Sequence, residues 1–496
     1  MTTTARVFQN YIGGKWQDAE SGKNFANHNP ATGEIIGYFP LSGEAEANAA
    51  VAAATAAFEK WRLVPAPKRG EILFRVGELL KQHKEELART MTQEMGKVLK
   101  ETRGDVQEGI DMAYYMAGEG RRLFGYSVPV ELSNKSGVAT RDPVGVVACI
   151  TPWNFPMAIP TWKMFPALVA GNTIVFKPAS DTPLSALRLV EIMYEAGLPE
   201  GVVNIVFGPG GTVGEALLHN PDVTVISFTG STESGRHVAI EAAKSLKRVS
   251  LEMGGKNAVI VMDDADLNLA VEGILWSAYG TTGQRCTACS RVIVHSAVRK
   301  QLVDLLLPRI EQLRLGNGLD ESVDVGPVIN ASQLSKIHSY TEIGKNEGAN
   351  LVTGGHVDKE GELAHGHFYR PTLFTNVKPD MRIAQEEIFG PVLSMIEVSS
   401  FEEAIAVNNN SKFGLSSAIY TQAINRVQRA MRDITTGILY VNSGTTGAEI
   451  QFPFGGTRGT GNGHREAGIA GLDVFTEWKV VYTDYSGKLQ KAQIDQ

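Results

Sequence analysis

The sequence predicts an α/β protein with two domains built on parallel sheets and a small β extension. From residue 144, short runs of β-branched residues alternate with helix-compatible segments, and turn-forming residues follow most of the runs. The same alternation starts again near Asn257 and continues to about residue 450. This alternation is typical of parallel, doubly wound sheets. A chain of 496 residues is also too long for a single core.

The composition is that of an ordinary globular enzyme. Hydrophobic residues make up 43% and charged residues 20% of the chain, which argues against disorder. A net charge of −7 gives no support for nucleic acid or an anionic membrane as a partner, and no apolar run reaches the roughly 18 residues of a membrane span. The N-terminus has no apolar signal core, and three cysteines are too few for a disulfide scaffold. We therefore expect a cytoplasmic protein.

The first quarter of the chain is expected to be mostly helical. Residues 41–61 are rich in Ala, and Pro65 and Pro67 break that run. Apolar residues return with helical spacing over residues 68–100, and a third helical stretch covers about 100–124. We assign residues 1–125 and 144–254 to one domain and residues 255–455 to the second.

Short apolar runs mark the strands of the first domain: Val144–Ile150, Thr173–Phe176, Val202–Phe207, Val223–Phe228 and Val249–Leu251. The second domain is expected to begin with a strand over Asn257–Met262 and to include helices over 264–279 and 296–314. Residues 126–143 and 473–496 contain extended stretches outside both sheets. Such strands can pair with each other or with another subunit, so we assign them to oligomerisation.

The turns that follow the strands of the first domain predict a ligand site, because parallel sheets bind ligands beyond the carboxyl ends of their strands. Gly208-x-Gly210-x-x-x-Gly214 misses a dinucleotide fingerprint by one residue, and Gly230-x-x-x-x-Gly235 lacks the Lys-Ser/Thr of a P-loop. Each alone is best explained by turn glycines. Together, at successive strand ends, they favour a nucleotide site of unusual geometry, with Ser231 opening a helix whose amides suit a pyrophosphate.

Cys286 is the candidate nucleophile. A lone Cys is more often an inert buried thiol, but here Arg285 adjoins it and Gly283 loosens the turn, which would favour the thiolate. Cys289 completes a Cys-x-x-Cys spacing, yet no second pair of ligands lies nearby in the sequence, so no metal site is expected.

Two carboxylates are candidates for acid–base chemistry. Glu252 follows an apolar strand, where a helix cap or a surface charge is the ordinary explanation and a general base the alternative. Glu387 has the same two explanations.

Seven motifs together resemble the NAD(P)-dependent aldehyde dehydrogenase superfamily, in order and spacing across essentially the whole chain. They are Pro152-Trp-Asn-Phe-Pro156, Lys177-Pro-Ala, Phe228-Thr-Gly-Ser-Thr232, Leu251-Glu-Met-Gly-Gly-Lys256, Gly283-Gln-Arg-Cys286, Glu387-Ile-Phe-Gly-Pro391 and Pro453-Phe-Gly-Gly456. The resemblance implies a Rossmann-like cofactor domain, a catalytic domain and a small β oligomerisation domain. It implies a homo-oligomer, either a dimer or a tetramer.

The resemblance also implies residue roles. Cys286 would attack the aldehyde, Asn154 and the Cys286 N–H would stabilise the oxyanion, and Glu252 would activate the hydrolytic water. Glu477 resembles a second acidic residue of the proton path. NAD or NADP would be held by residues that follow the strands and by the Glu387 motif: Thr151, Pro152, Trp153, Lys177, Ser180, Gly230, Ser231, Gly254, Glu387 and Phe389. Ser180 stands where many NAD-preferring members have Glu, so NADP should be tolerated.

The sequence is most similar to semialdehyde dehydrogenases of the 2-oxoglutarate and aminoadipate semialdehyde type. Both substrates end in a carboxylate, which Arg285 could bind, although a structural salt bridge is the alternative role for Arg285. Thr287, Arg458 and His464 are the other candidate substrate residues. The competing hypotheses are a broad-range aldehyde dehydrogenase, an enzyme that passes its thioester to coenzyme A, and a catalytically silent structural or binding homologue. Glu252, Cys286 and Asn154 argue against the last two.

Overall fold

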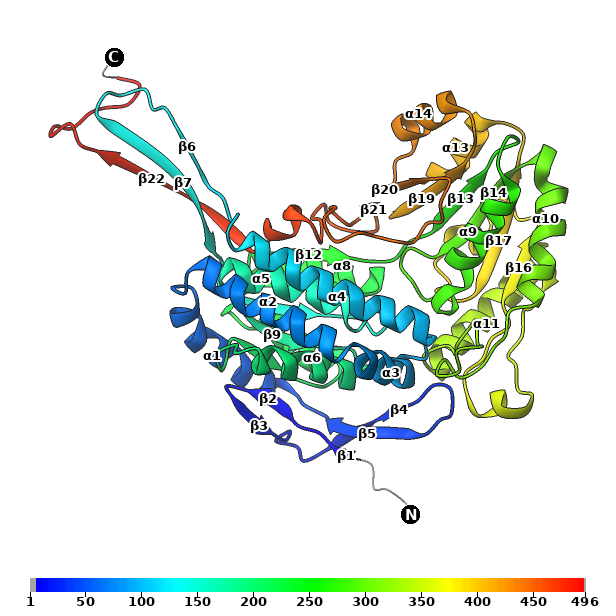
Figure 1. Ribbon diagram of the computed structural model, residues 1–496, viewed down its shortest axis with the longest axis horizontal. Coiled ribbons are helices and arrows are strands. Elements are labelled where there is room, and N and C mark those ends of the chain that lie inside the picture. The colour runs from blue at the N-terminus through cyan, green and yellow to red at the C-terminus, as the bar shows by residue number, and fades with distance from the viewer. Residues whose placement is uncertain (1–5, 495–496) are drawn as a thin grey trace.

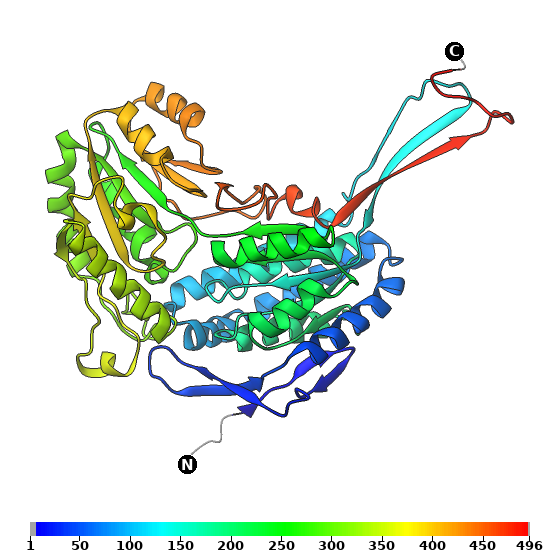
Figure 2. The same cartoon turned by 180° about the vertical axis from the view of Figure 1, so that it is seen from behind.

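Two lobes and a projecting arm make up the computed structural model, which describes residues 6–494 (Figure 1). The first five residues of the expected cofactor domain and the last two of the expected oligomerisation segment lie outside the described residues. The arm extends from the first lobe, away from the second (Figures 1 and 2). Among the helices of residues 6–494, none has the length and apolar character that a membrane crossing requires.

The first lobe is built on a seven-stranded sheet whose strands run in the order β12-β11-β8-β9-β10-β2-β3. The first five are parallel, and β2 and β3 continue the sheet antiparallel. The central strands are buried along their whole length, because helices cover both faces of the sheet. The strands are β2 (Asn10–Ile12), β3 (Lys15–Gln17), β8 (Val146–Ile150), β9 (Thr173–Lys177), β10 (Val203–Ile205), β11 (Val223–Thr229) and β12 (Arg248–Glu252).

The helices of this lobe divide between the two faces. One face packs against the Ala-rich α1 and against α7 and α8. The other packs against a layer that includes α5, a helix buried at every position. The helices are α1 (Glu44–Trp61), α2 (Ala66–Gln82), α3 (Lys84–Met95), α4 (Leu99–Glu119), α5 (Ala158–Ala170), α6 (Pro183–Glu195), α7 (Glu215–His219) and α8 (Thr232–Lys244).

The second lobe repeats the plan with the strand order β15-β16-β17-β14-β13-β19-β20, parallel except for β15. Helices again cover both faces. Its strands are β13 (Asn257–Val261), β14 (Cys289–His295), β15 (Asn350–Thr353), β16 (Thr372–Thr375), β17 (Val392–Val398), β19 (Ser416–Tyr420) and β20 (Ile438–Val441). Its helices are α9 (Leu267–Tyr279), α10 (Ser296–Glu311), α11 (Ala331–Asn346), α12 (Arg382–Gln385), α13 (Phe401–Asn409) and α14 (Ile424–Asp433).

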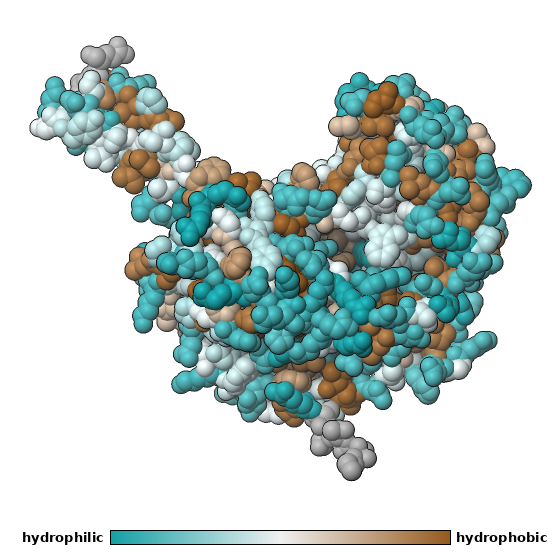
Figure 3. All heavy atoms as spheres, in the orientation of Figure 1, coloured by the Kyte–Doolittle hydropathy of each residue, from teal (hydrophilic) through white to brown (hydrophobic). Residues whose placement is uncertain are grey.

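The arm is a three-stranded antiparallel sheet of β22 (Thr476–Asp484), β7 (Lys135–Pro143) and β6 (Tyr126–Val128). β7 pairs with β22 from Thr476↔Pro143 to Asp484↔Lys135, so the two expected extended segments pair with each other. Apolar side chains are exposed on this arm (Figure 3), among them those of Val128, Val480, Val481 and Tyr482.

Residues 6–40 differ from the mostly helical expectation. Besides β2 and β3 they form β1 (Arg6–Val7), β4 (Asn24–His28) and β5 (Ile35–Pro40), which make a separate sheet in the order β1-β5-β4. These strands are short and only partly buried, so they carry little of the apolar alternation that marks a strand in a sequence. A further two-stranded sheet joins β18 (Phe413–Gly414) to β21 (Thr457–Arg458).

Candidate active site

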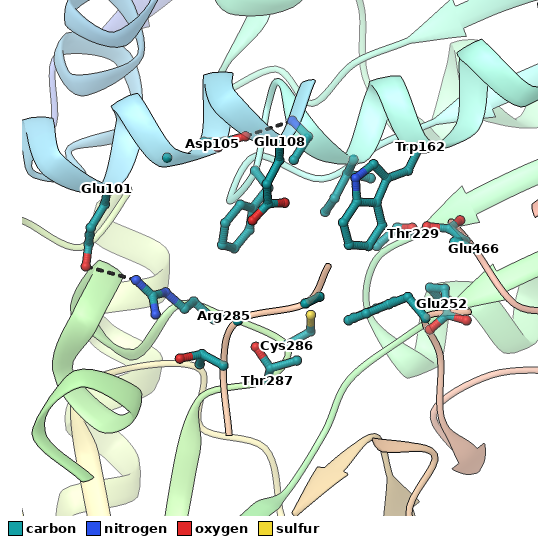
Figure 4. Close-up of a pocket in the computed structure, with 18 of the residues that line it drawn as sticks. Glu101, Asp105, Glu108, Trp162, Thr229, Glu252, Arg285, Cys286, Thr287 and Glu466 are labelled. Carbon is teal, nitrogen blue, oxygen red and sulfur yellow. Dashed lines mark hydrogen bonds and ion pairs between the residues drawn. The ribbon is translucent and has the colours of Figure 1, made fainter. Parts of the chain in front are cut away.

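Cys286 lies between two cavities at the junction of the lobes. One, of about 190 Å³, is lined mainly by α4, α5, the Cys286 loop and the loop around residue 447 (Figure 4). The other, of about 160 Å³, is lined by turns at the ends of β8, β11 and β12 and by residues of α11 and the Glu387 motif. Cys286, Ile159, Thr229 and Met253 line both cavities. Ligands in the two cavities can therefore approach Cys286 from different sides.

The loop that carries Cys286 is held in an unusual backbone conformation. Thr281, Thr282 and Gly283 have φ of 52°, 57° and 68°, and a side chain at Gly283 would meet the carbonyl of Gly390 at 2.3 Å. The Glu101 carboxylate stabilises the turn by accepting hydrogen bonds from the Thr281 N–H at 2.9 and 3.0 Å. Such strain persists only where the surroundings hold it, as they do here around the nucleophile.

Asn154 contacts the loop that carries Cys286. Its side chain is buried, and its Nδ2 donates to the carbonyl of Gln284 at 3.0 Å. One amide hydrogen is used in this bond, and the second remains for an oxygen that forms beside Cys286. Asn257 fixes the same loop from the other side by donating to the Cys286 carbonyl at 2.7 Å.

The thiol itself is not activated in the protein alone. Burial raises the pKa of Cys286 to about 12, and the charges of Glu252 and Glu387 add to the shift. The Arg285 guanidinium was expected to favour the thiolate, but it is paired with Glu101 at 3.0 Å and does not lower this pKa. The prediction that Arg285 activates the thiol is therefore wrong for the protein without ligands.

Glu252 ends β12 and is 4% exposed. Neither of its carboxylate oxygens has a hydrogen-bond partner among residues 6–494. Burial raises its pKa well above the usual value, and the neighbouring Glu466 raises it further. A general base with a raised pKa takes up a proton readily but must then pass it on.

Glu466 and Lys163 form a buried ion pair behind Glu252. Lys163 also donates to the hydroxyl of Ser227 at 3.3 Å. Lys163 is fully buried in α5, whose other residues are all uncharged, and a buried lysine requires a buried acid. That sequence signal could have pointed to Glu466, which the sequence analysis missed.

Glu477, the expected second acidic residue, does not reach the site. It lies on β22 in the arm, is exposed, and pairs with Arg248. It lines neither cavity at Cys286. Glu466, in the loop before the arm, instead lines the cavity at Cys286 together with Glu252.

The residues expected to bind the cofactor divide into two groups. Lining the second cavity are Pro152, Trp153, Gly230, Ser231, Gly254, Glu387 and Phe389. Thr151, Lys177 and Ser180 lie at the ends of β8 and β9 and do not line it. Lys177 Nζ donates to the Pro178 carbonyl at 2.9 Å, and burial lowers its pKa to about 8. Gln333 and Lys336 of α11 also line the cavity, and nothing in the sequence pattern singled them out.

The expected substrate residues are also split. Arg285 and Thr287 line the first cavity, whereas Arg458 and His464 do not. Arg458 instead donates to the carbonyl of Phe413 at 2.9 Å, in the small β18–β21 sheet. His464 is half-buried in the C-terminal loop, and burial lowers its pKa. Arg285 does form a structural salt bridge, with Glu101, while lining the cavity.

The family model described as "Aldehyde dehydrogenase family" matches residues 16–481, almost the whole chain. The chain belongs to the aldehyde dehydrogenase family. It is therefore an oxidoreductase that oxidises an aldehyde, and the family, fold and aldehyde-oxidising activity expected from the sequence are confirmed.

Individual members of the aldehyde dehydrogenase family align with this chain over its full length. It is 42% identical over 481 residues to the alpha-ketoglutaric semialdehyde dehydrogenase of Bacillus subtilis strain 168, covering 97% of this chain and 99% of that one. It is 44% identical to the alpha-ketoglutarate semialdehyde dehydrogenase of Haloferax volcanii, covering 96% and 99%. Betaine aldehyde dehydrogenase of Staphylococcus aureus, solved in complex with NAD+, superposes with a TM-score of 0.95 at 35% identity, covering 97% and 96%.

Proposed function

We propose that this protein is an NAD(P)-dependent, hydrolytic dehydrogenase of a semialdehyde that carries a carboxylate at its far end. The observation that carries the proposal is the pair of cavities that share Cys286. One cavity is lined by strand-end turns, which suit a dinucleotide. The other is lined by aromatic rings, by carboxyl groups of α4 and by Arg285, and the guanidinium of Arg285 suits a small acidic aldehyde.

The second cavity fits a nicotinamide cofactor. Glu387 Oε1 accepts from the Gly255 N–H at 2.9 Å, and the bare Cα of Gly254 makes room for the same carboxylate, because an added Cβ would lie 2.3 Å from Oε2. Oε2 is thus available for a ribose hydroxyl, and the α8 N-terminus at Ser231 for the pyrophosphate. The cofactor, when bound, supplies the hydride acceptor.

Both NAD and NADP fit the chain. The Staphylococcus aureus relative was solved with NAD+, which supports NAD. Ser180, which donates to the carbonyl of Gly208 at 3.5 Å, brings no negative charge that would repel a 2′-phosphate. Relative rates with NAD and NADP measure which of the two this chain prefers.

Acylation is the task of Cys286 and Asn154. The thiol proton passes to solvent water as the sulfur attacks the carbonyl carbon, and a C–S bond forms while the carbonyl oxygen becomes an oxyanion. The free Nδ2 hydrogen of Asn154 and the Cys286 N–H stabilise that charge, each by about 3 kcal/mol. Loss of hydride from this carbon leaves a thioester on Cys286.

Deacylation is the task of Glu252. It takes a proton from a water molecule as the water oxygen attacks the thioester carbon, and cleavage of the C–S bond releases the acid. Glu466, which is paired with Lys163, is placed to receive the proton next. An enzyme that passes its acyl group to coenzyme A has no need of this base, so Glu252 supports hydrolysis.

Relatives that act on acid semialdehydes support the substrate class. Besides the two alpha-ketoglutarate enzymes, the glutarate-semialdehyde dehydrogenase of Pseudomonas putida KT2440 is 40% identical to this chain. Arg285 uses Nε for Thr281 and one Nη2 hydrogen for Glu101, and its remaining hydrogens can reach a carboxylate in the cavity.

The arm supports a homo-oligomer, dimer or tetramer. β22 is an edge strand with every residue after Thr476 exposed, including Trp478 and Val480. An uncovered edge of this kind invites pairing with another chain. Residues 126–143 and 473–496 are then the oligomerisation segments of the chain. A monomer by light scattering at micromolar concentration contradicts this part of the proposal.

The three cysteines are free, which supports a reducing compartment such as the cytoplasm.

We assign one domain to each of the two large sheets: residues 1–125 and 144–254 to cofactor binding, and residues 255–455 to catalysis.

A substrate panel tests the function directly. We expect acid semialdehydes such as glutarate semialdehyde to be oxidised with a higher kcat/KM than an uncharged aldehyde of equal length, pentanal. Release of free acid without added coenzyme A is expected. A preference for pentanal contradicts the substrate class, and a requirement for coenzyme A contradicts hydrolysis.

A further inference from the structure

Helix α4 presents three carboxyl groups to the cavity on the substrate side of Cys286. Glu101, Asp105 and Glu108 are spaced by four and three residues, so they lie along one face of the helix. All three line the cavity, and Figure 4 shows the Glu108 side chain directed into it. The family motifs in the sequence include none of these residues.

Two of the three carboxyls have a cation of their own. Glu101 pairs with Arg285 at 3.0 Å, and Asp105 pairs with the fully buried Lys97 at 2.7 Å. Each also accepts backbone hydrogen bonds, Glu101 from Thr281 and Asp105 from Ala158 at 2.7 Å. Both carboxylates are therefore part of the framework that holds the cavity walls together.

Glu108 differs from the other two. Within residues 6–494 it makes no hydrogen bond and no ion pair with protein. A carboxyl group that is left without a partner in a protein wall is costly unless a ligand completes it. Its place in the substrate cavity indicates that the substrate does so.

Two unpartnered donors line the same cavity. The indole Nε1 of Trp162 and the hydroxyl of Thr446 are buried, and neither has a hydrogen-bond partner in the described chain. An N–H group and a hydroxyl, like the free guanidinium hydrogens of Arg285, are complementary to an acceptor-rich ligand. A carboxylate has two oxygens that accept up to four hydrogen bonds.

We propose that Glu108 selects the substrate by donating a hydrogen bond from its protonated carboxyl group to the distal carboxylate of the semialdehyde. This inference rests on the proposed function, since it names a second residue, besides Arg285, that recognises the carboxylate. Trp162 and Thr446 supply further donors to the same group. Ionised Glu108 would repel an acidic substrate, so the protonated form is the binding form.

The surroundings of Glu108 keep it protonated at neutral pH. Burial and the charge of Asp105 raise its pKa to about 8, while Lys97 and Arg285 oppose the shift. Asp111, one turn further along α4, raises it slightly. The other ionisable groups that face it come from the remaining walls of the site: Lys100 and Glu101 of α4, Cys286 of its loop, Tyr440 of β20, Glu252 of β12 and Glu466 of the C-terminal loop.

The alternative occupant is a cationic aldehyde. Ionised Glu108 would attract an ammonium group, and the rings of Trp162, Trp276 and Phe454 in the same wall would favour it further. The two occupants predict opposite dependence on pH. Binding of an anion weakens as pH rises through 8, whereas binding of a cation strengthens.

Three five-carbon or similar aldehydes separate these cases: glutarate semialdehyde, pentanal and 4-trimethylaminobutanal. We expect the ratio of kcat/KM for glutarate semialdehyde to that for pentanal to fall about tenfold between pH 7 and pH 9, because the neutral fraction of a group with a pKa near 8 falls by that factor. Taking the ratio cancels the titration of Cys286 and Glu252, which both substrates share.

Glu108→Gln should abolish this pH dependence of the ratio, because the amide donates a hydrogen bond but does not titrate. Asp111→Asn is the matched control. It removes a carboxylate from the same helix outside the cavity and should keep the fall. An equal pH dependence in Glu108→Gln and wild type overturns the role of Glu108. A 4-trimethylaminobutanal ratio that rises with pH, and does so only with Glu108 present, overturns the choice of an anion.

A binding measurement on the wild-type enzyme covers the case in which Glu108→Gln fails to fold. Glutarate, the unreactive diacid, should bind at pH 8.5 with uptake of most of one proton, seen by calorimetry in two buffers of different ionisation enthalpy. Binding without proton uptake overturns the proposal for Glu108 while leaving the proposed function intact. A wild-type preference for pentanal at pH 7 rejects the proposed function, and the inference with it.

Discussion

The two cavities that meet at Cys286 are lined by different kinds of chemical groups. The cofactor side is lined by backbone turns at strand ends, with glycines where a side chain would collide. The substrate side is lined by aromatic rings and by ionisable side chains from α4 and the Cys286 loop. Backbone turns are fixed by the fold, whereas side chains change without disturbing it. Substrate preference can therefore be altered in this protein with less effect on cofactor binding.

Substitution of Cys286, which lines both cavities, has the largest expected effect. Cys286→Ala should abolish turnover, by at least about 10⁴-fold, because no other group can form the acyl intermediate. Cofactor affinity, measured by fluorescence titration, should remain. Cys289→Ala is the control and should stay active, since Cys289 is buried and lines neither cavity. Full activity of Cys286→Ala contradicts covalent catalysis.

Glu252→Gln should separate the two half-reactions. The amide resembles the neutral acid but cannot take a proton from water, so turnover should fall by about 10²- to 10⁴-fold. A rapid burst of NAD(P)H, followed in stopped-flow absorbance, should survive if only deacylation is impaired. Loss of the burst indicates that Glu252 also removes the proton of Cys286, a thiol whose pKa is raised by burial.

Arg285→Ala tests the substrate side and has a smaller expected effect. A charge-assisted bond to a carboxylate contributes about 1.5–3 kcal/mol, so kcat/KM for glutarate semialdehyde should fall roughly 10- to 150-fold more than for pentanal. The ion pair with Glu101 complicates the variant, because Ala leaves that buried carboxylate without its cation.

The double variant Glu101→Gln/Arg285→Ala removes both charges. The side-chain amide of the Gln still offers an oxygen that can accept the hydrogen bond from the Thr281 N–H. If kcat/KM of the double variant falls by the same factor for glutarate semialdehyde and for pentanal, Arg285 serves only to hold the Cys286 loop.

Cys286 and seven of the ten expected cofactor residues lie around one cavity, and the sequence could predict this grouping because these residues belong to contiguous motifs at strand ends. The lining of the other cavity could not be predicted in this way. Glu101, Asp105 and Glu108 look like an ordinary polar face of a helix, and only the packing of α4 against the Cys286 loop turns that face inward. Arg458 and His464 lie near family motifs in the sequence but do not line this cavity, because closeness in sequence does not fix closeness in space.

Glu477 gives the smallest expected effect and tests the correction to the proton path. It is 59% exposed on β22 and, within residues 6–494, pairs with Arg248 alone, and exposed pairs of this kind contribute about 0–1 kcal/mol. Glu477→Gln should therefore leave kcat/KM and its pH profile within about twofold of wild type, measured over pH 6–9.

Glu466→Gln should instead slow deacylation, because it removes the carboxylate that receives the proton from Glu252 and leaves Lys163 buried without a counter-ion. Loss of thermal stability in Glu466→Gln is expected from that unpaired lysine, so the comparison is made on the ratio of burst to steady-state rate, which a uniform loss of folded enzyme does not change. A larger ratio of burst to steady-state rate for Glu477→Gln than for Glu466→Gln would indicate that the proton passes through Glu477 on the arm.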